Sequence, residues 1–253
     1  MPDEFIIKVL FGGLGDHLFL SHLPRIAKES GGFKRVYISN LSEYRNIEYK
    51  DFVWGSNPHV DGFTDQDAPY PLKMLVDRGN NVLDQVMLLR GLDDGLRYHE
   101  PELYIKPPII ESLRDKVVFD PNYISNVGQF ESAHVEKFFA KEGITPDYML
   151  ALRPKGVSIE KYGAILTTES LMHYCSVIVS ARKFICFSSG GATLAAALGV
   201  PAIVLWGPGQ HGMFHHSRLH RYVNVNPQSF PRKAWDYLTW RYRYTRDRLK
   251  EKV

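Results

Sequence analysis

Apolar and polar positions alternate in two regular ways along the first half of the chain. Continuous apolar runs predict strands, and apolar positions three or four residues apart predict helices. By these patterns, strands are expected at residues 5–11, at 35–39 and at the start of the segment 51–65, ahead of Asn57-Pro58, and helices at residues 16–29 and within 72–90. Gly31 and Gly32 are expected to end the first helix, and Asn57-Pro58 favours a turn. This order of elements is typical of a parallel α/β sheet.

The same alternation resumes beyond a proline-rich stretch, where Pro101, Pro107 and Pro108 favour a linker or an extended crossover. Strands are expected at residues 116–119, 148–152, 184–187 and 202–206, and helices at residues 131–141, 168–180, 192–198 and 232–250. Thr167 or Thr168 is expected to cap the second of these helices.

The simplest architecture that fits this order is α/β, with two Rossmann-like halves and a final amphipathic helix. The expected parts are an N-terminal domain over residues 1–112, a C-terminal domain over residues 113–228, and a helix over residues 229–253 that packs back on the N-terminal domain.

The composition is that of an ordinary soluble globular protein, because 44% of the 253 residues are hydrophobic and 23% are charged. A chain of this length buries a core without disulfides. Cys175 and Cys186 lie in a helical and a strand pattern, so both are expected to be buried thiols of a reduced compartment. The first residues lack a secretory pattern, and no apolar run is long enough to span a bilayer, which favours a cytoplasmic protein.

The net charge of +3 is unevenly distributed along the chain. Residues 231–253 hold eight Lys or Arg against three acidic residues, so the remainder is slightly acidic and is no general polyanion binder. This basic, aromatic tail is expected to pack back on the N-terminal domain. Peripheral contact with an anionic membrane or a lipid-linked acceptor is a second interpretation. Nucleic-acid binding is not expected, since no nucleic-acid motif accompanies the charges.

Two glycine-rich loops follow predicted strands, at the sheet edge where ligands bind in such folds. The second of them, residues 188–191 (Ser-Ser-Gly-Gly), opens a helix of small apolar residues. Backbone N–H groups and the helix dipole favour an anion at such a helix start. The serines add hydroxyl donors, and the glycines let a diphosphate approach the backbone. By loop chemistry alone, a serine-capped turn that binds no ligand is an equally good interpretation of residues 188–191.

The first loop, residues 12–15, leads directly into Asp16. It lacks the Lys of a Walker-type phosphate loop and the full glycine pattern of a dinucleotide fingerprint. Asp16 either caps the helix that follows, which the residue pattern alone favours, or takes a proton from a substrate hydroxyl as a general base. The helix N-terminus is expected to lower the pKa of Asp16, which keeps it ionised but makes it a weaker base.

Three segments of the sequence match motifs of one known family. The segment "GGLGDHLFLSHLP" is similar to an N-terminal Gly-Asp…Leu-Pro motif, and "SNPHVDGF" to an Asn-Pro-x-[Val/Ile]-Asp motif. The segment "ILTTESLMHYCSVIVSARKFICFSSGGATLAAALGVPAIVLWGPG" parallels an Asp-[Ser/Thr]-Gly motif and its surroundings without a gap. Together they resemble the ADP-heptose:lipopolysaccharide heptosyltransferases. This resemblance implies a GT-B-like fold, with a cleft between two Rossmann-like domains and a C-terminal helix.

The resemblance also implies roles for individual positions. Asp16 matches the base that deprotonates the acceptor hydroxyl, and Gly13, Gly15 and His17 belong to the acceptor-side loop. The donor diphosphate is expected to contact Ser188, Ser189, Gly190, Gly191, Thr193 and Gly207. No metal or cofactor is implied, because loop N–H groups and the helix dipole stabilise the leaving diphosphate. This sequence has Ser188 at the position of the Asp that precedes [Ser/Thr]-Gly in the family's motif. It has Thr193 at the position of the His in the same motif.

A histidine-rich segment follows the second glycine loop, with His211 and His215, and likewise His216 and His220, spaced four residues apart. A metal site would need these side chains on a formed helix with a further ligand. The surrounding glycines predict a loop instead, one that reaches over the cleft with a histidine or Arg218 near the diphosphate.

Taken with the resemblance to the heptosyltransferases, the sequence predicts a metal-independent glycosyltransferase. It would move a sugar from a nucleotide-sugar donor to a glycan or lipid-linked acceptor in bacterial surface polysaccharide biosynthesis, in the cytoplasm or at the inner face of the cytoplasmic membrane. A nucleotide-sugar hydrolase or epimerase of the same fold is one alternative. A non-catalytic nucleotide- or sugar-binding module is another.

Overall fold

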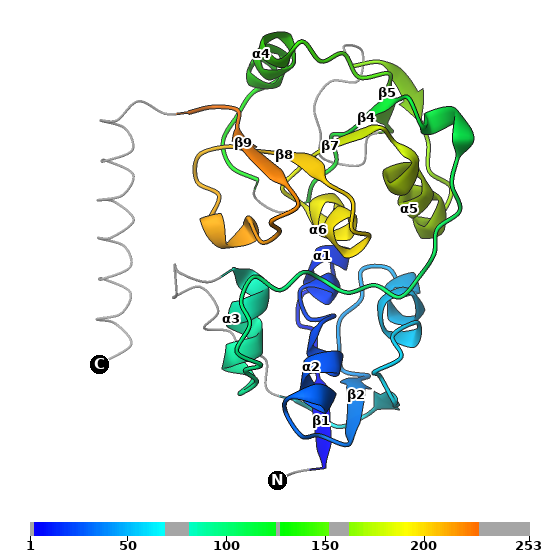
Figure 1. Ribbon diagram of the computed structural model, residues 1–253, viewed down its shortest axis with the longest axis vertical. Coiled ribbons are helices and arrows are strands. Elements are labelled where there is room, and N and C mark those ends of the chain that lie inside the picture. Colours follow the sequence, from blue (N-terminus) through cyan, green and yellow to red (C-terminus); the bar gives the residue numbers. More distant parts are fainter. Residues whose placement is uncertain (1–2, 69–80, 125–126, 152–161, 228–253) are drawn as a thin grey trace.

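Two parallel β-sheets organise the protein (Figure 1). The computed structural model describes residues 3–68, 81–124, 127–151 and 162–227. The smaller sheet has the order β1–β2–β3, formed by Glu4–Ile7, Arg35–Ser39 and Gly62–Thr64. The larger has the order β6–β5–β4–β7–β8–β9, formed by Ala164–Leu166, Tyr148–Leu150, Val117–Asp120, Lys183–Phe187, Ala202–Trp206 and Arg221–Asn224. Every strand pairing within these residues is parallel, so the predicted α/β class is confirmed.

Helices connect the strands and cover the sheets. In the described part of the chain they are α1 (Leu14–Leu18), α2 (Leu23–Glu29), α3 (Val82–Leu89), α4 (Ser132–Glu142), α5 (Leu171–Ser180) and α6 (Gly190–Ala197). Short 3₁₀ turns occur at Glu111–Leu113 and Gly212–Phe214. None of the helices within these residues is long and apolar enough to cross a membrane.

The helix predicted over residues 16–29 is divided into α1 and α2. Pro24 lies in the first turn of α2 and has no N–H with which to bond the carbonyl of Leu20, so a continuous helix cannot pass this point. The intervening residues form tight turns instead, in which the N–H of Leu23 bonds the carbonyl of Leu20 at 3.1 Å. This break separates the short helix that carries Asp16 from the one that covers the sheet.

Other predicted elements differ in type or extent. The strand expected near residue 52 is wrong, because Lys50–Gly55 forms a π-helical turn that buries Val53 and Trp54. A short apolar run does not distinguish a buried helix from a strand. The predicted N-cap of α5 is also wrong, since Ser170 caps it and its Oγ accepts the N–H of His173 at 3.1 Å. Strands β3, β6 and β9 were not predicted, and all three are short.

The apolar core has two parts, one on each face of the larger sheet. Val118 and Phe184 point into a cluster that continues through α6, α1 and α2 to the smaller sheet. Phe119 and Ile185, the next side chains along the same two strands, point into a second cluster with α4. Cys175 and Cys186 are buried free thiols, as expected.

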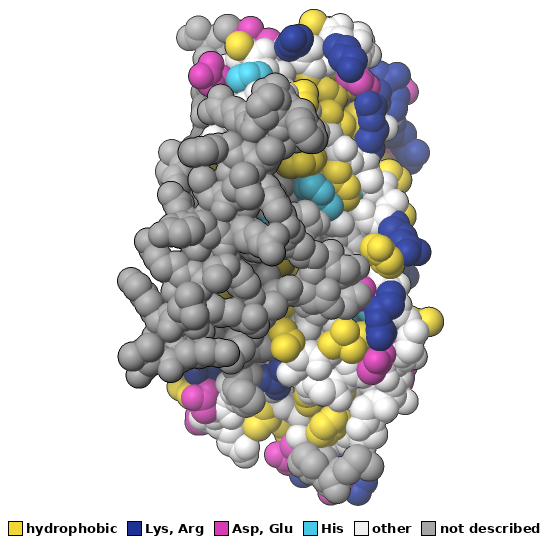
Figure 2. Space-filling model, turned by 90° about the vertical axis from the view of Figure 1, so that its left-hand side faces the viewer, with side chains coloured by type: hydrophobic (Ala, Val, Ile, Leu, Met, Phe, Trp, Pro, Cys, Tyr) yellow, Lys and Arg dark blue, Asp and Glu magenta, His cyan; other side chains and the backbone are white. Residues whose placement is uncertain are grey.

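The chain passes between the two sheets as an extended segment, residues 100–110, without regular secondary structure, as the prolines predicted. Arg25 on α2 holds this segment through Glu102 at 2.7 Å. On the face shown in Figure 2, Lys and Arg side chains gather toward the right-hand edge, and acidic side chains lie near both ends. The helix predicted for residues 229–253 lies outside the described residues.

Candidate functional site

Helices α1 and α6 pack against each other (Figure 1). A cavity of about 490 Å³ is lined by residues of both helices. This volume is in the range of small-molecule binding sites. The cavity is lined from both parts of the chain, and its polar lining includes Asp16, Arg45, Tyr49, Asp120, Asn122, Tyr174, Ser188, Ser189, Thr193, Gln210 and His216. Asp120 ends β4, and residues 188–191 follow β7, so the cavity lies at the carboxyl ends of parallel strands.

Asp16 lies in the first turn of α1, at the third helical position. Its Oδ2 accepts the N–H of Gly13 at 3.1 Å, which is a capping contact made from inside the helix and not from the N-cap position. Burial raises the pKa of Asp16 to about 6, although the bond from Gly13 and the charge of Arg45 act in the opposite direction. The expected lowering of this pKa is therefore wrong, because desolvation exceeds the combined lowering by the Gly13 N–H and the Arg45 charge.

Gly15 on α1 and Gly190 on α6 bring the two glycine loops into direct contact. A Cβ atom placed on Gly15 would lie 3.3 Å from the Cα of Gly190 and 3.6 Å from Oγ1 of Thr193. A Cβ atom on Gly13 would lie 2.7 Å from Oδ2 of Asp16. The glycines thus allow the helices to approach each other and allow the Asp16 carboxylate to fold back on its own loop.

The loop at residues 188–191 presents a helix N-terminus to the cavity. Ser189 is the N-cap of α6, and its carbonyl accepts the N–H of Ala192 at 3.0 Å. An α-helix has no intrahelical acceptor for the N–H groups of its first residues, here Gly190 and Gly191. The Oγ of Ser189 donates to the carbonyl of Asn122 at 3.2 Å, so this hydroxyl hydrogen is directed away from a ligand. Ser188 is buried at the cavity wall, and its carbonyl accepts from Nε2 of Gln210 at 3.2 Å.

Asp120 and Tyr174 form a buried polar pair at the base of this loop. The Tyr174 hydroxyl donates to Oδ2 of Asp120, and the amide of Asn122 donates to Oδ1 at 2.9 Å. A Cβ atom on Gly191 would lie 2.4 Å from the Tyr174 hydroxyl oxygen and 3.0 Å from Oδ2 of Asp120. The absence of a side chain at Gly191 therefore makes room for this pair.

Thr193 and His216 also meet in the cavity lining. Oγ1 of Thr193 lies 3.3 Å from Nε2 of His216, and both side chains are buried. His216 comes from the loop after β8, which the sequence predicted would reach over the site. Arg218 from the same loop does not line the cavity, since its guanidinium stacks over the ring of Tyr98 at 3.6 Å.

Two residues expected at the site lie elsewhere. The ring of His17 points into the core, where Nδ1 accepts from Trp54 at 3.0 Å and Nε2 lies 3.0 Å from the carbonyl of Glu43. Gly207 packs against the backbone of Gln129, which a Cβ atom would approach to 2.6 Å. Both are outside the cavity lining because close packing with their own surroundings fixes them there. Asp16, Gly13, Gly15, Ser188, Ser189, Gly190, Gly191 and Thr193 all line it.

Sequence reasoning missed Arg45, Asp120, Asn122 and Tyr174. Asp120 carried a usable signal, because it directly follows a buried strand just as the first glycine loop does. Arg45 gave none, since its place depends on the bond from its N–H to the carbonyl of Gly12 at 2.8 Å. Within the residues that the structure describes, no group of three or more His, Cys, Asp or Glu could hold a metal ion.

Comparison with known proteins identifies the fold. No protein-family model matches the sequence, and no curated protein is similar enough to match. Several solved structures match at 12–14% identity. A glycosyl transferase family 9 protein from Veillonella parvula has a TM-score of 0.50, and the match covers 88% of this chain and 86% of that chain.

Two heptosyltransferase structures are also similar. The E. coli heptosyltransferase WaaC with ADP has a TM-score of 0.51 and 13% identity, over 87% of this chain and 93% of that chain. The dodecameric iron-containing heptosyltransferase TibC in complex with ADP-D-β-D-heptose has a TM-score of 0.58 and 14% identity, over 85% of this chain and 61% of its own. At this level of identity the likeness establishes a shared α/β fold with glycosyltransferases.

Proposed function

We propose that this protein is a glycosyltransferase of GT-B type that uses a nucleotide-sugar donor. The observation that carries the proposal is the pairing of two features in one cavity. Asp16 has its pKa raised to about 6, and it lies beside the N-terminus of α6, which favours an anion. Transfer of a sugar from a diphosphate requires both a base and an anion site. The similarity to solved glycosyltransferases supports the same assignment.

Asp16 would take the proton of the acceptor hydroxyl while the acceptor oxygen attacks the anomeric carbon of the donor sugar. A carboxylate with a pKa near 6 is ionised at neutral pH and is a stronger base than an ordinary Asp. Arg45 contributes positive charge near the carboxylate. Gly13 and Gly15 leave the loop open enough for the acceptor to approach.

The donor diphosphate would lie against Gly190 and Gly191, at the start of α6. The first-turn N–H groups and the dipole of this eight-residue helix would stabilise the charge that develops as the diphosphate leaves. This mechanism requires no metal ion, and we propose metal-independent transfer on that basis. The hydrogen-bonded pair of Tyr174 and Asp120 packs against the same loop.

The acceptor is proposed to be a glycan or a lipid-linked saccharide of bacterial surface polysaccharide biosynthesis, and the protein to act in the cytoplasm. The motif resemblance and the heptosyltransferases among the similar structures support this context. The excess of Lys and Arg in residues 231–253 supports contact with an anionic membrane surface.

A thermal-shift screen with ADP-, GDP-, UDP- and CMP-sugars tests the donor site. At least one of these is expected to raise the melting temperature, because a ligand that binds only the folded state stabilises it. If none does, the donor-site assignment is wrong. The stabilising sugar is then incubated with purified protein, with and without a membrane glycolipid extract as acceptor and with a chelator present.

The products distinguish the remaining functions. Transfer that continues with the chelator and is lost in Asp16→Asn supports the proposal. Release of free sugar without an acceptor identifies a hydrolase, and a changed sugar configuration identifies an epimerase. Binding without any product identifies a non-catalytic binding module. Unchanged turnover in Asp16→Asn would remove Asp16 as the base.

A further inference from the structure

The buried ring of His17 joins α1 to a neighbouring segment, the Arg45 loop (residues 43–45). Nε1 of Trp54 donates to Nδ1 of His17 at 3.0 Å, and Nε2 of His17 lies 3.0 Å from the carbonyl oxygen of Glu43. Trp54 comes from the π-helical turn that the sequence pattern did not predict. One side chain thus connects α1, the Arg45 loop and this turn.

Only one neutral form of the His17 ring satisfies both partners. An indole N–H can only donate, so Nδ1 accepts from Trp54 and the ring hydrogen resides on Nε2, which donates to the carbonyl of Glu43. Burial lowers the pKa of His17 to about 4, although the bond to Glu43 acts in the opposite direction. The ring of Tyr44 stacks on it, with 4.6 Å between centroids. At neutral pH, His17 is therefore a fixed donor to the main chain of the Arg45 loop.

The main chain of the Arg45 loop also runs against the first glycine loop. The N–H of Glu43 donates to the carbonyl of Val9 at 2.9 Å, and the N–H of Arg45 donates to the carbonyl of Gly12 at 2.8 Å. A Cβ atom on Gly12 would lie 2.8 Å from the backbone nitrogen of Arg45, so the two main chains touch here. With the bond from His17, three hydrogen bonds fix this short segment.

The side chain of Arg45 reaches from its loop into the cavity lining, beside Asp16. A Cβ atom on Gly13 would lie 2.7 Å from Oδ2 of Asp16 and 3.4 Å from Nη1 of Arg45, so both charged groups lie over the same glycine. Within the described residues, neither a hydrogen bond nor an ion pair holds the guanidinium itself. Its place beside the carboxylate therefore depends on the main chain of the Arg45 loop.

We propose that His17 is a positioning residue, which holds Arg45 beside Asp16 through the main chain of the Arg45 loop. The effect on turnover rests on the function proposed above, whereas the effect on the Asp16 carboxyl does not. Without the bond from His17 to Glu43, the loop is held less firmly and the guanidinium is less often near the carboxylate. The positive charge then stabilises ionised Asp16 less, so the pKa of Asp16 rises further.

This change reaches the reaction through the ionised fraction of Asp16. The acceptor proton passes to the carboxylate, so only the ionised form acts as the base. A higher pKa lowers kcat/KM on the acidic side of the profile and leaves the plateau at high pH nearly unchanged. Loss of a merely structural histidine would instead lower kcat/KM at every pH. The pH profile thus separates positioning from a general loss of folded protein.

Two substitutions separate the two hydrogen bonds of His17. The amide nitrogen of Gln lies near the place of Nε2 and can donate to the carbonyl of Glu43. The side chain of Asn is one carbon shorter and cannot reach that carbonyl, but its amide oxygen lies near the place of Nδ1 and can accept from Trp54. Both variants lose the ring and its stacking on Tyr44, so their difference isolates the bond to the Arg45 loop.

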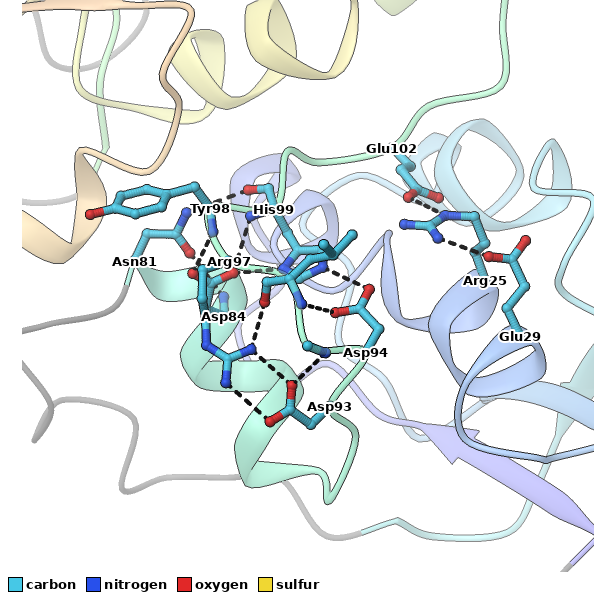
Figure 3. Close-up of polar contacts among 12 residues, drawn as sticks. Arg25, Glu29, Asn81, Asp84, Asp93, Asp94, Arg97, Tyr98, His99 and Glu102 are labelled. Carbon is cyan, nitrogen blue, oxygen red and sulfur yellow. Dashed lines mark hydrogen bonds and ion pairs between the residues drawn. The ribbon is translucent and has the colours of Figure 1, made fainter.

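His22 provides a matched control. It is fully buried, lies outside the cavity lining, and has its ring centroid 5.4 Å from that of His99. Figure 3 shows His99 between two carboxylates, with Nδ1 at 2.6 Å from Oδ1 of Asp84 and Nε2 at 3.1 Å from Oδ2 of Asp94. His22→Asn thus disturbs a buried histidine beside this network, at a different place from the Arg45 loop.

The first measurement is the titration of the Asp16 carboxyl, followed by its ¹³C NMR signal, which Asp16→Asn identifies. We expect the midpoint to rise by about half to one pH unit in Arg45→Met, because Arg45 is an opposite charge that is itself exposed. His17→Asn should give at least half of that rise, and His17→Gln and His22→Asn no more than a quarter of it.

Other titratable groups line the same cavity from other elements, and every one of these variants keeps them. They are Tyr49, Asp120, Tyr123, Tyr174 and His216. A midpoint that differs between the variants therefore reports on the charge of Arg45 and not on these groups.

A double variant tests whether His17 acts through Arg45. In the Arg45→Met background, His17→Asn should add no further rise, because the charge that His17 positions is gone. An equal rise in both backgrounds overturns the inference. So does an unchanged midpoint in Arg45→Met or His17→Asn, or the same rise in His17→Gln as in His17→Asn.

Trp54→Phe keeps the inference testable should His17→Asn fail to fold. Without the indole N–H, the ring of His17 can carry its hydrogen on Nδ1, and the bond to Glu43 is then lost. The midpoint should rise in Trp54→Phe and should not rise further when Trp54→Phe is added to Arg45→Met. A midpoint that stays at the wild-type value in Trp54→Phe overturns the inference.

Turnover separates this inference from the proposed function. With ADP-, GDP-, UDP- or CMP-sugars as donors, kcat/KM of His17→Asn is expected to fall about twofold at pH 5 and to equal that of the wild type at pH 8.5. A wild type that turns over none of them overturns the proposed function, while the carboxyl titration still decides the role of His17. Equal losses of kcat/KM at both pH values, with an unchanged titration, overturn the inference alone.

Discussion

Gly15 of α1 and Gly190 of α6 touch through their backbones. A Cβ atom on Gly190 would lie 3.3 Å from the backbone nitrogen of Gly15, and one on Gly15 would lie equally close to the Cα of Gly190. Contacts this close leave no room for a side chain on either residue unless the two helices move apart by a few tenths of an ångström. The contact joins the two glycine loops and fixes Asp16, the next residue, relative to the first turn of α6.

The first prediction is that Gly15→Ala impairs activity more than stability. The added methyl group must separate α1 from α6 by a few tenths of an ångström, which displaces Asp16 from the donor. Ala favours a helix over Gly by about 1 kcal/mol, and this gain offsets the contact strain. We expect kcat/KM to fall by roughly tenfold or more, while the free energy of unfolding changes by about 1 kcal/mol.

Gly55→Ala is the control for that variant. Gly55 also lies in a helical turn, and the three atoms nearest to its added methyl group all belong to the Asp51 side chain, the nearest being Oδ1 at 3.4 Å. Activity should then stay near that of the wild type. A Gly15→Ala protein with full activity would show that the two loops do not form one site.

The second prediction concerns Gly191 and Tyr174. Gly191→Ala places a methyl group against the Tyr174 hydroxyl, and overpacking of this kind costs about 1 to 3 kcal/mol. Tyr174→Phe removes the bond to Asp120 and costs about 1 to 2 kcal/mol. The double variant should be more stable than the sum of the two losses predicts, because removal of the hydroxyl leaves space for the methyl group.

Denaturant unfolding of the four proteins in this cycle measures the coupling. Tyr162→Phe provides the comparison, since Tyr162 is buried in the other core cluster and its hydroxyl lies 3.4 Å from the carbonyl of Ser132. Its effect should simply add to that of Gly191→Ala. Simple additivity in the Tyr174 cycle as well would contradict the packing described here.

Sequence pattern predicted the parallel α/β class because buried strands and amphipathic helices differ in periodicity over enough residues. It failed at Lys50–Gly55, where an apolar run of three residues supports either a strand or a helix. It also failed at β6 and β9, whose few residues are half-exposed edge positions that gain their structure from the neighbouring strand.

The two glycine loops were identifiable for a related reason, because their place after buried strands is visible in the sequence. Their mutual contact was not, since it depends on how α1 and α6 pack. His17 illustrates the limit well: it stands next to Asp16 in the chain, yet the turn of the helix directs its ring into the core. Conversely, Thr193 and His216 are 23 residues apart and meet only in the folded protein.

The third prediction concerns the buried network of His99, Asp84 and Asp94. The bond to Asp84 raises the pKa of His99 despite burial. Hydrogen bonds from His99 and backbone N–H groups lower the pKa values of both carboxyls, although burial alone would raise them. The contribution of His99 to the free energy of unfolding is complete below the ordinary histidine pKa of 6.5. It is lost as the pH rises through the raised pKa that His99 has in the folded protein. The carboxylate contributions are present above 3.8 and are lost as pH falls through the lowered values.

The network should therefore stabilise the protein most between about pH 4 and pH 6.5. His99→Asn is expected to reduce the free energy of unfolding by about 3 kcal/mol at pH 5.5, and by less at pH 9, measured by denaturant unfolding. His59→Asn, in which the altered ring is partly exposed, should cost little at either pH. An equal loss for His99→Asn at both pH values would show that the His99 charge contributes nothing.

The fourth prediction is the pH dependence of activity that Asp16 imposes. A general base must be ionised, so kcat/KM should fall about tenfold per pH unit below the Asp16 pKa of about 6 and level off above it. Arg45 lowers this pKa, so Arg45→Met should move the midpoint to higher pH, whatever it does to the maximal rate. A midpoint that stays in place, or moves to lower pH, would exclude Asp16 as the group that titrates.

The same raised pKa predicts that the ionised Asp16 lowers stability at neutral pH. The stabilising effect of its protonated form is complete below pH 3.8 and is lost as pH rises to about 6, because folding favours the protonated carboxyl. Asp16→Asn keeps an oxygen that can accept the N–H of Gly13 and removes the buried charge. The free energy of unfolding of the variant should therefore exceed that of the wild type by about 1 to 3 kcal/mol at pH 7.5, and should not exceed it at pH 4. Measured together with the loss of turnover, this gain would identify Asp16 as a residue kept for activity at the expense of stability.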